Sequence, residues 1–220
     1  MRIHAMAFLT ALSSLCCGDA SAGSTIRLPQ PTTAGSVSLE ETLQARRSRR
    51  SYTEETVTLE ELSQLLWAAQ GLTSPRGYRA SPSAGALYPL ETLVVASSID
   101  SLPPGVYRYL PSEHALVRES EADLTELAEA ALGQGCVREA AAVIVLAAVY
   151  ERVTDVYGTR GKRYVHMEVG HTSQNIYLQC ETLGLGTVAV GAFEDSEVAE
   201  LLGLPSDQKP LYLMPVGRPR

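Results

Sequence analysis

The longest unbroken apolar stretch of the chain runs from Ala140 to Val149 and contains no charged residue. It is too short to cross a membrane and fits a central strand that is covered on both faces. Shorter apolar and β-branched stretches, bounded by turn residues, predict further strands. These are 91–97, 106–110 and 115–117 as a hairpin, 187–191 and 211–216.

Helical periodicity follows recognisable start signals. Thr58 and Glu61 form a capping box ahead of leucines at helical spacing, and Asp123 with Glu126 repeats the signal. The longest predicted helix spans 160–183 and ends before a glycine. Its apolar stripe is Val165, Val169, Thr172 and Ile176, and further helices are predicted at 39–46, 59–70, 124–132 and 195–202.

Helices and strands follow one another without a strict alternation, which predicts a single α+β domain over 39–220. Residues 23–38 are rich in Ser, Thr, Pro and Gly and are expected to be a linker or N-terminal arm. Residues 1–22 are typical of a secretory signal peptide, with Ala20-Ser21-Ala22 as the cleavage site. The protein is therefore expected to be exported, to the periplasm, with a lipoprotein on Cys16 or Cys17 and a cytoplasmic N-terminus as the alternatives.

The formal net charge is −7, yet four arginines and two serines lie within residues 46–52. Guanidinium forks match phosphate oxygens, so this arginine run predicts a phosphate clamp. The alternative is a solvated basic turn, and the first-turn acids of the helix 39–46 followed by arginines at its end explain part of the pattern. The acidic balance elsewhere excludes general nucleic-acid binding, and no span long enough for a membrane helix occurs.

Three further segments carry candidate chemistry. The small residues and prolines of 81–89 predict a rigid loop whose backbone approaches a ligand, although a packed connector has the same composition. The glycines of 184–191 follow a helix and open a strand, the reverse of a dinucleotide-binding turn. Glu168, His171 and Asn175 share one helix face, which fits a polar stripe on the surface or towards a second subunit.

Other site types find less support in the sequence. His171 has no second ligand at metal-binding spacing, and no nucleophile elbow, phosphate-binding P-loop or zinc-protease motif occurs. Metal binding is therefore not expected. Cys136 and Cys180 are the two cysteines beyond residue 22, and their spacing is compatible with a disulfide in an oxidising compartment or with two buried thiols.

Taken in order, these segments resemble the nitroreductase family of FMN flavoproteins. More narrowly, they resemble its SagB-type dehydrogenase branch, as a stand-alone member. The resemblance implies a three-layer α+β sandwich, with a central mixed, largely antiparallel sheet flanked by helices. It also implies a homodimer with FMN at the subunit interface. The segments that carry it are Arg46–Tyr52, Pro82–Pro89, Arg163–Asn175, Gly184–Thr187 and Pro215–Pro219.

The resemblance also implies roles for individual residues. The arginine run meets the FMN phosphate and the pyrimidine edge of the flavin, through Arg46, Ser48 and Arg50 or, with the register shifted, Arg47 and Arg49. The loop Pro82, Ser83, Ala84 and Gly85 lies against FMN from the partner subunit. The backbone of Val188, Ala189 and Gly191 lies near flavin N5, and Arg218 or Arg220 is the last phosphate contact. Lys162 and Tyr164 are candidates for a catalytic pair.

The predicted function is that of an FMN-dependent oxidoreductase, which transfers hydride through flavin N5 with NAD(P)H as the donor. This chemistry does not require an acid–base dyad, in agreement with the absence of one from the motifs. A non-catalytic, flavin-binding member of the family is the alternative. A secreted interaction module that binds an anionic partner through its basic turn is the third hypothesis.

Overall fold

The computed structural model describes residues 25–220. The predicted signal peptide, residues 1–22, lies outside the described residues. Part of the predicted arm forms a strand, because β1 (Thr25–Arg27) pairs antiparallel with β4 and sets Ile26 opposite Leu116. No described helix is both long and apolar enough to cross a membrane.

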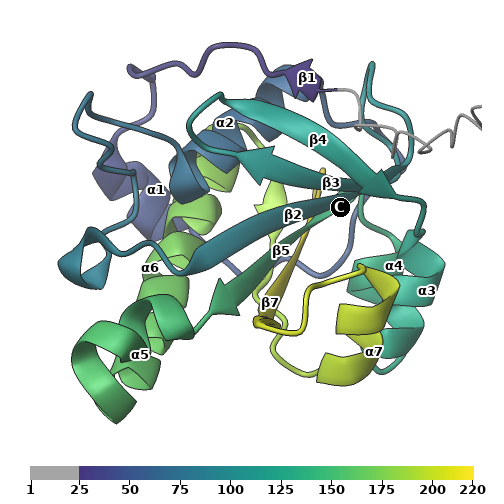
Figure 1. Cartoon of the computed structure of the whole chain (residues 1–220). Coiled ribbons are helices and arrows are strands. Elements are labelled where there is room, and N and C mark those ends of the chain that lie inside the picture. The colour runs from purple at the N-terminus through teal and green to yellow at the C-terminus, as the bar shows by residue number, and fades with distance from the viewer. Residues whose placement is uncertain (1–24) are drawn as a thin grey trace, which may run out of the picture.

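A seven-stranded sheet forms the middle layer of the molecule, in the order β1-β4-β3-β2-β5-β7-β6 (Figure 1). All of these strand pairs are antiparallel, and parallel pairing occurs as isolated bridges, including one between Ser48 and Thr187. The sheet therefore agrees with the predicted, largely antiparallel type. The remaining strands are β2 (Leu90–Ala96), β3 (Gly105–Leu110), β4 (Ala115–Ser120), β5 (Ala142–Val149), β6 (Gly186–Thr187) and β7 (Gln208–Gly217).

The apolar stretch 140–149 becomes β5, which lies between β2 and β7 and is buried along its whole length. Its side chains alternate between two apolar clusters, with Ile144 and Leu146 on one face and Val143 and Val145 on the other. Each cluster is closed by a layer of helices, as strand alternation requires. This arrangement confirms the predicted three-layer α+β fold.

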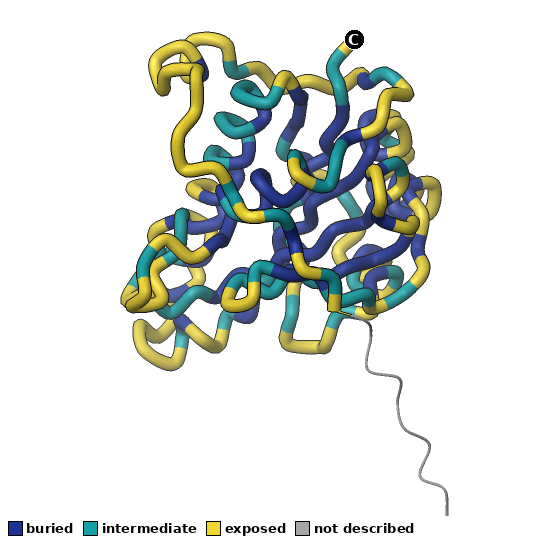
Figure 2. The backbone as a smooth tube through the Cα atoms, turned by 90° about the horizontal axis from the view of Figure 1, so that it is seen from above, coloured by how far each residue is buried: buried dark blue, intermediate teal, exposed yellow. Residues whose placement is uncertain are grey.

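The two helical layers differ in size (Figure 1). Two long helices and two short ones pack on the face of Ile144, and short helices alone pack on the face of Val143. Figure 2 shows the buried backbone at the centre of the molecule, with exposed loops around it. The first layer holds α1 (Leu39–Ala45), α2 (Leu59–Gln70), α5 (Glu151–Tyr157) and α6 (Gly161–Thr182), and the second holds α3 (Leu124–Ala130), α4 (Gly135–Arg138) and α7 (Asp195–Leu201).

The predicted helix starts are confirmed by their hydrogen bonds. The Thr58 hydroxyl accepts the Glu61 amide at 3.1 Å, and the Glu61 carboxylate accepts the Thr58 amide at 2.9 Å. Asp123 and Glu126 cap α3 in the same way. The apolar stripe of the long helix is buried, and Gly184 takes the left-handed conformation just after it, with φ 67°. Local capping signals therefore located these helices correctly.

Three sequence predictions need correction. Residues 187–191 do not form a strand: β6 ends at Thr187, and Val190 contacts β7 only through an isolated bridge to Leu213. The helix predicted over 39–46 ends at Ala45, with Arg46 as its C-cap and no basic residue in its last turn. The short helices α4 and α5 were not predicted, because neither has a side-chain cap at its start.

Both cysteines beyond residue 22 are buried free thiols. Cys180 belongs to the cluster covered by the long helices, and Cys136 belongs to the cluster on the opposite face of the sheet. The sheet separates them, so they do not pair. Burial raises the pKa of the Cys136 thiol above its ordinary value, which keeps it protonated at neutral pH.

Hydrogen bonds fasten the N-terminal arm to the domain. The Pro29 carbonyl accepts the Ser63 hydroxyl at 2.6 Å and lies 2.9 Å from Nε2 of His114. Further along, the Gln64 side chain accepts the Thr32 amide at 2.8 Å and donates to the Thr32 carbonyl at 3.0 Å. The arm therefore packs against the first half of α2.

Candidate functional site

The arginine run leaves the end of α1 and lies alongside β6. The Arg49 amide donates to the Thr187 carbonyl at 2.9 Å, next to the bridge between Ser48 and Thr187. A Cβ atom on Gly186 would lie 2.8 Å from Cβ of Arg49, so the close approach of the two segments requires glycine. The fold therefore joins two of the motifs found in the sequence.

Among the described residues, the guanidiniums of the run have no carboxylate partners in ion pairs. Within residues 25–220, neither Arg46, Arg47, Arg49 nor Arg50 forms an ion pair. The Arg47 guanidinium donates to the backbone carbonyls of Gln44 and Arg46, and the Arg47 backbone amide donates to the Glu181 carboxylate at 3.1 Å. Four like charges held together without counter-charges repel one another, which an anionic ligand would relieve.

Tyr177 on α6 links the run to the glycine segment. Its hydroxyl lies 3.0 Å from the Ser48 hydroxyl and accepts the Ala189 amide at 2.8 Å. The guanidinium of Arg46 lies 5.3 Å from the centre of the Tyr177 ring, within the range of a cation–π contact. Burial raises the pKa of Tyr52 and of Cys136, and the charge of Arg50 opposes this rise at both groups. Arg46 and Ser48 thus share one side of the site.

Two polar groups beside the run have no partner among the described residues. The hydroxyl of Thr187 is buried and makes no hydrogen bond there. Gly191 is exposed, and its amide donates to none of the described residues, whereas the amides of Ala189 and Val190 are bonded to Tyr177 and Leu213. Buried polar groups are normally paired, so the Thr187 hydroxyl marks a place where a polar ligand fits.

The loop that carries Pro82, Ser83, Ala84 and Gly85 includes the short helix η1 (Ala84–Ala86). Three of its residues have left-handed backbone angles, Gly85 at φ 62°, Ala86 at φ 53° and Tyr88 at φ 47°.

For the alanine and the tyrosine this conformation costs on the order of 1–3 kcal/mol each. Such a loop persists only where its surroundings hold it. Pro82 and Gly85 are exposed, in agreement with a loop available to a ligand.

The loop and the arginine run lie at different positions along α6. Ser83 faces Glu168, whereas Ser48 and Arg46 contact Tyr177. Glu168 and Tyr177 lie about 14 Å apart along the helix axis, given the rise of an α-helix. The tip of the loop therefore lies away from Tyr177 along the helix, whereas its first residue, Ser81, contacts Asn175.

The predicted polar stripe of α6 divides into buried and exposed members. Glu168 is 2% exposed, Asn175 is half-buried, and His171 is exposed. The amide of Asn175 donates to the Ala68 carbonyl and to the Ser81 hydroxyl, both at 3.1 Å. Asn175 therefore ties α2 and the loop to α6, and the stripe is not the surface feature that its polarity indicated.

Burial raises the pKa of Glu168 to about 7, while the Ser83 hydroxyl and the Arg79 guanidinium that face it oppose the rise. Arg79 itself is held by a chain of hydrogen bonds. It donates to the Gln70 side chain at 3.0 Å, and Gln70 donates to the Thr172 hydroxyl at 2.9 Å. A buried polar network therefore lies directly behind the loop.

Lys162 and Tyr164 do not form a pair. Two residues apart on a helix, they point in different directions, and Lys162 is exposed. The Tyr164 ring packs edge-on against Tyr157, with ring centres 5.2 Å apart. The Tyr157 hydroxyl lies 2.8 Å from the Cβ position of Gly85, so Tyr164 reaches the loop through Tyr157. Of the two candidates, only Tyr164 lies near a predicted cofactor segment.

Arg218 and Arg220, the predicted last phosphate contacts, are bound to carboxylates. Both oxygens of Glu61 accept the Arg218 guanidinium at 3.0 Å, and Glu55 lies 3.6 Å from it. Arg220 lies 3.7 Å from Glu139. These two arginines therefore differ from the run, whose guanidiniums have no acidic partner in residues 25–220.

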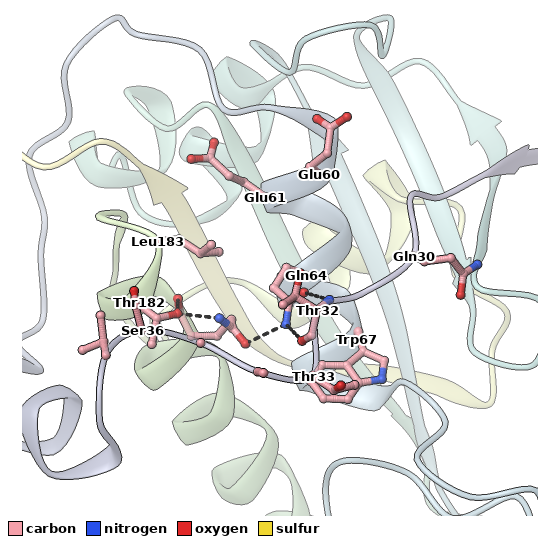
Figure 3. A pocket seen from close by; sticks show the side chains of 14 residues that line it. Gln30, Thr32, Thr33, Ser36, Glu60, Glu61, Gln64, Trp67, Thr182 and Leu183 are labelled. Carbon is pink, nitrogen blue, oxygen red and sulfur yellow. Dashed lines mark hydrogen bonds between the residues drawn. The ribbon is translucent and has the colours of Figure 1, made fainter.

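A cavity of about 490 Å³ lies between the N-terminal arm, α2 and the end of α6 (Figure 3). Trp67, Gln64, Glu60 and Glu61 point into it or along its rim. None of the residues predicted to bind the cofactor lines this cavity. Its carboxylates also make it unsuited to a phosphate. The described residues contain no group of three or more His, Cys, Asp or Glu placed to hold a metal ion.

Comparison with known proteins agrees with this geometry. The model of the nitroreductase family matches residues 43–218. The nitroreductase-like protein MJ1384 of Methanocaldococcus jannaschii is 51% identical over 183 residues, which are 83% of this chain and 91% of that protein. The microcin B17-processing protein McbC of Escherichia coli is more distant, at 30% identity over 132 residues, 57% of this chain and 48% of McbC.

Solved structures show the same fold. A nitroreductase-like protein of Ralstonia eutropha aligns with a TM-score of 0.78 and 30% identity, covering 89% of this chain and 90% of that one. The NADPH:FMN oxidoreductase of Vibrio harveyi, solved with NAD⁺, aligns with a TM-score of 0.60 and 26% identity, covering 82% and 68%. Fold and relatives thus define an oxidoreductase of the α+β class. The chain belongs to the nitroreductase family.

Proposed function

We propose that this protein is an FMN-dependent oxidoreductase that acts as a homodimer. The observation that carries the proposal is the arginine run, whose guanidiniums form no ion pair within residues 25–220 and whose Arg46 lies against Tyr177. The Thr187 hydroxyl beside the run has no partner among the described residues. A phosphate brings the negative charge that this group lacks, and its oxygens accept several N–H and O–H donors at once. The family relationship supports a flavin as the molecule that carries the phosphate.

Arg46 and Ser48 would hold the phosphate, with Arg50 or the neighbouring guanidiniums of the run adding positive charge. Tyr177 holds Ser48 and the Ala189 amide in fixed positions, so the two sides of the site keep their spacing. The Gly191 amide, which donates to none of the described residues, is available to the ring system. When bound, FMN supplies hydride exchange at its N5 atom, and nearby positive charge favours the electron-rich form of the ring.

The separation of the two motifs along α6 supports a dimer. One chain places its arginine run near Tyr177 and its Pro82–Gly85 loop near Glu168, so a loop from a second copy can complete the first site. Several apolar side chains next to the run are exposed, which is typical of a surface that a partner covers. They include Val37, Leu39 and Leu43.

NAD(P)H is proposed as the hydride donor, in line with the name of the Vibrio harveyi relative. A SagB-type, stand-alone dehydrogenase is proposed within the family, because the loop and long-helix motifs resemble that branch and McbC is among the relatives. None of the residues gathered at the site forms a nucleophile–base pair, so the chain's contribution is to bind and orient reactants.

Anaerobic reduction tests the activity. The purified protein, loaded with FMN, is mixed with NADH or with NADPH, and the visible flavin absorbance is followed. The proposal predicts rapid bleaching by at least one donor and recovery on adding an oxidant such as a nitroaromatic compound or a quinone. Bound FMN that bleaches with dithionite but with neither nicotinamide would instead indicate the non-catalytic, flavin-binding alternative.

A further inference from the structure

His114 is a half-buried histidine for which the proposed function gives no role. It lies in the turn between β3 and β4 and has a left-handed backbone, at φ 47°. Its Nδ1 atom lies 2.8 Å from the Tyr109 hydroxyl on β3. Its Nε2 atom lies 2.8 Å from the Ser63 hydroxyl on α2 and 2.9 Å from the Pro29 carbonyl on the N-terminal arm. The ring therefore joins the arm to two core elements.

These contacts fix where the hydrogen of the neutral ring lies. The Pro29 carbonyl can only accept, and it accepts the Ser63 hydroxyl at 2.6 Å. Nε2 of His114 must then carry a hydrogen, because an unprotonated nitrogen would face the carbonyl oxygen with no hydrogen between them. This leaves Nδ1 to accept the Tyr109 hydroxyl. A neutral ring with its hydrogen on Nε2 thus satisfies all three partners.

A second proton on the ring conflicts with this arrangement. It would occupy Nδ1, where the Tyr109 hydroxyl already points, and that hydroxyl has no other partner among the described residues. Tyr109 is the titratable group that faces the ring, and burial raises its pKa, so it stays protonated. Within residues 25–220 no ion pair reaches the ring, and Glu113 in the same turn is exposed.

The burial of the ring acts in the same direction. Burial lowers the pKa of His114 below its ordinary value, and the hydrogen bond to the Pro29 carbonyl, which favours the charged ring, opposes this effect. A charged ring can regain water only if an element that covers it moves away. The closed structure therefore favours the neutral form of His114.

The arm is the least firmly held of the elements around the ring. β3 and α2 are core elements, whereas residues 32–37 of the arm are exposed. The Leu28 amide donates to the His114 carbonyl at 3.0 Å, and Thr32 exchanges two hydrogen bonds with the Gln64 side chain. Local opening occurs where few contacts hold the backbone, so the arm is the element that yields to a charged ring.

The same arm forms one wall of the cavity beside α2. Residues 32–37 line the cavity from the arm, and Trp67 lines it from α2 (Figure 3). Pro29, which the His114 ring contacts, lies three residues before this wall. Movement of the arm away from α2 would therefore open the cavity and expose Trp67 to solvent.

We propose that the N-terminal arm is a pH-sensitive strap: neutral His114 holds it over the cavity beside Trp67, and protonation of His114 releases it. In the open state the ring regains the ordinary pKa of 6.5, above that of the closed state. The closed-to-open ratio is therefore highest above pH 6.5 and falls as the pH drops below this value, by up to about tenfold per pH unit. This device does not depend on bound flavin.

Two variants and a matched control test the strap. His114→Gln keeps side-chain N–H donors for the arm and does not titrate. Tyr109→Phe keeps the imidazole and removes the hydroxyl that opposes its protonation. His166→Gln is the control, because His166 pairs with Tyr150 in nearly the same geometry away from the arm. The ring centres are 5.7 Å apart in both pairs, and the planes meet at 87° there and at 89° for Tyr109 and His114.

Two measurements on the full-length protein follow the arm. Hydrogen exchange of peptides that contain Leu28, corrected for the intrinsic effect of pH, reports the amide that is bonded to His114. Acrylamide quenching of Trp67, the single tryptophan, reports access to the cavity. Between pH 7.5 and pH 5.5 the protection of Leu28 should fall by about threefold or more and the quenching of Trp67 should rise, while peptides of β5 stay protected.

The variants should separate His114 from other titrating groups. In His114→Gln the protection of Leu28 should agree within about twofold at the two pH values, because no proton is taken up at this position. Tyr109→Phe should show a smaller fall than the wild type, since its neutral imidazole lacks one hydrogen bond. His166→Gln should behave as the wild type.

Several results would overturn the strap. They are a wild type whose protection at Leu28 does not change with pH, a fall that β5 shares at the same pH, and a folded His114→Gln protein that keeps the pH dependence of the wild type. If His114→Gln does not fold, Tyr109→Phe decides, and a fall equal to that of the wild type overturns the strap equally. A protein that takes up no FMN would refute the proposed function and leave this result unaffected.

Discussion

Replacing Glu168 by glutamine should change how stability depends on pH. The pKa of this carboxyl is 4.5 in an unperturbed state and about 7 in the folded protein. Between these values the folded state keeps a proton that the unfolded state releases, so rising pH favours unfolding. The group therefore stabilises the fold at low pH, and this contribution disappears as the pH rises through about 7.

The magnitude follows from the size of the shift. The difference between 4.5 and about 7 corresponds to an upper bound of about 3 kcal/mol in the free energy of unfolding. Solvent that screens part of the carboxyl lowers this bound, and we expect about 2 kcal/mol. Glutamine does not titrate, so the stability of the variant lacks this contribution at every pH. Other groups, including His114 with its lowered pKa, titrate equally in both proteins and cancel in the difference.

The assay is urea unfolding of the flavin-free protein, followed by the fluorescence of the single tryptophan, Trp67, at one protein concentration. Between pH 4.5 and pH 8 the wild type should lose about 2 kcal/mol relative to Glu168→Gln. The test uses only the change of this difference with pH. The difference in the free energy of unfolding at any single pH also includes the cost of burying the glutamine amide. If the free energies of unfolding of the two proteins change in parallel over this pH range, burial does not raise the pKa of Glu168 as described.

Three further substitutions test the site. Changing Arg46 and Arg50 to Ala should raise the Kd for FMN by about 100-fold, and a Kd that does not depend on these charges would contradict the clamp. Tyr177→Phe removes a hydroxyl that holds two segments and should weaken FMN binding by about tenfold, with little change in Tm, as fluorescence quenching and thermal melts would show. Gly186→Ala should displace Arg49, since the new Cβ would lie 2.8 Å from it, and weaken FMN binding by about tenfold; an unchanged Kd would show that the close approach is dispensable.

Features encoded locally were predictable from the sequence. The capping boxes that begin α2 and α3 rely on side chains three residues apart, and the buried stripe of α6 follows helical spacing. The central strand β5 was predictable because burial on both faces demands an apolar residue at every position. In each of these elements the residues that decide the structure are close in sequence.

Features that depend on distant partners were not predictable in the same way. Tyr177 was missed because its contacts lie 129 residues away at Ser48 and 12 residues away at Ala189, with no motif to mark them. Residues 187–191 have strand composition but leave the sheet after Thr187. Glu168 has the polarity of a surface residue, and only the packing of the loop and α2 against α6 buries it.

The sequence did identify the arginine run, and the structure shows why it stands apart. None of its four guanidiniums forms an ion pair with a described carboxylate, whereas Arg218 is bound by Glu61 and Glu55. Sequence alone left open which arginines share a face. The contacts of Arg46 and Ser48 with Tyr177 place these two together.

The central claim, that the arginine run and the loop form an FMN site, is tested most directly by the flavin content of the purified protein. The protein is incubated with FMN, separated from free flavin by gel filtration, and its flavin is released and quantified against the polypeptide. The account predicts FMN in equal amount to the chain, eluting with a dimer. A monomer that carries no flavin after this incubation would contradict it.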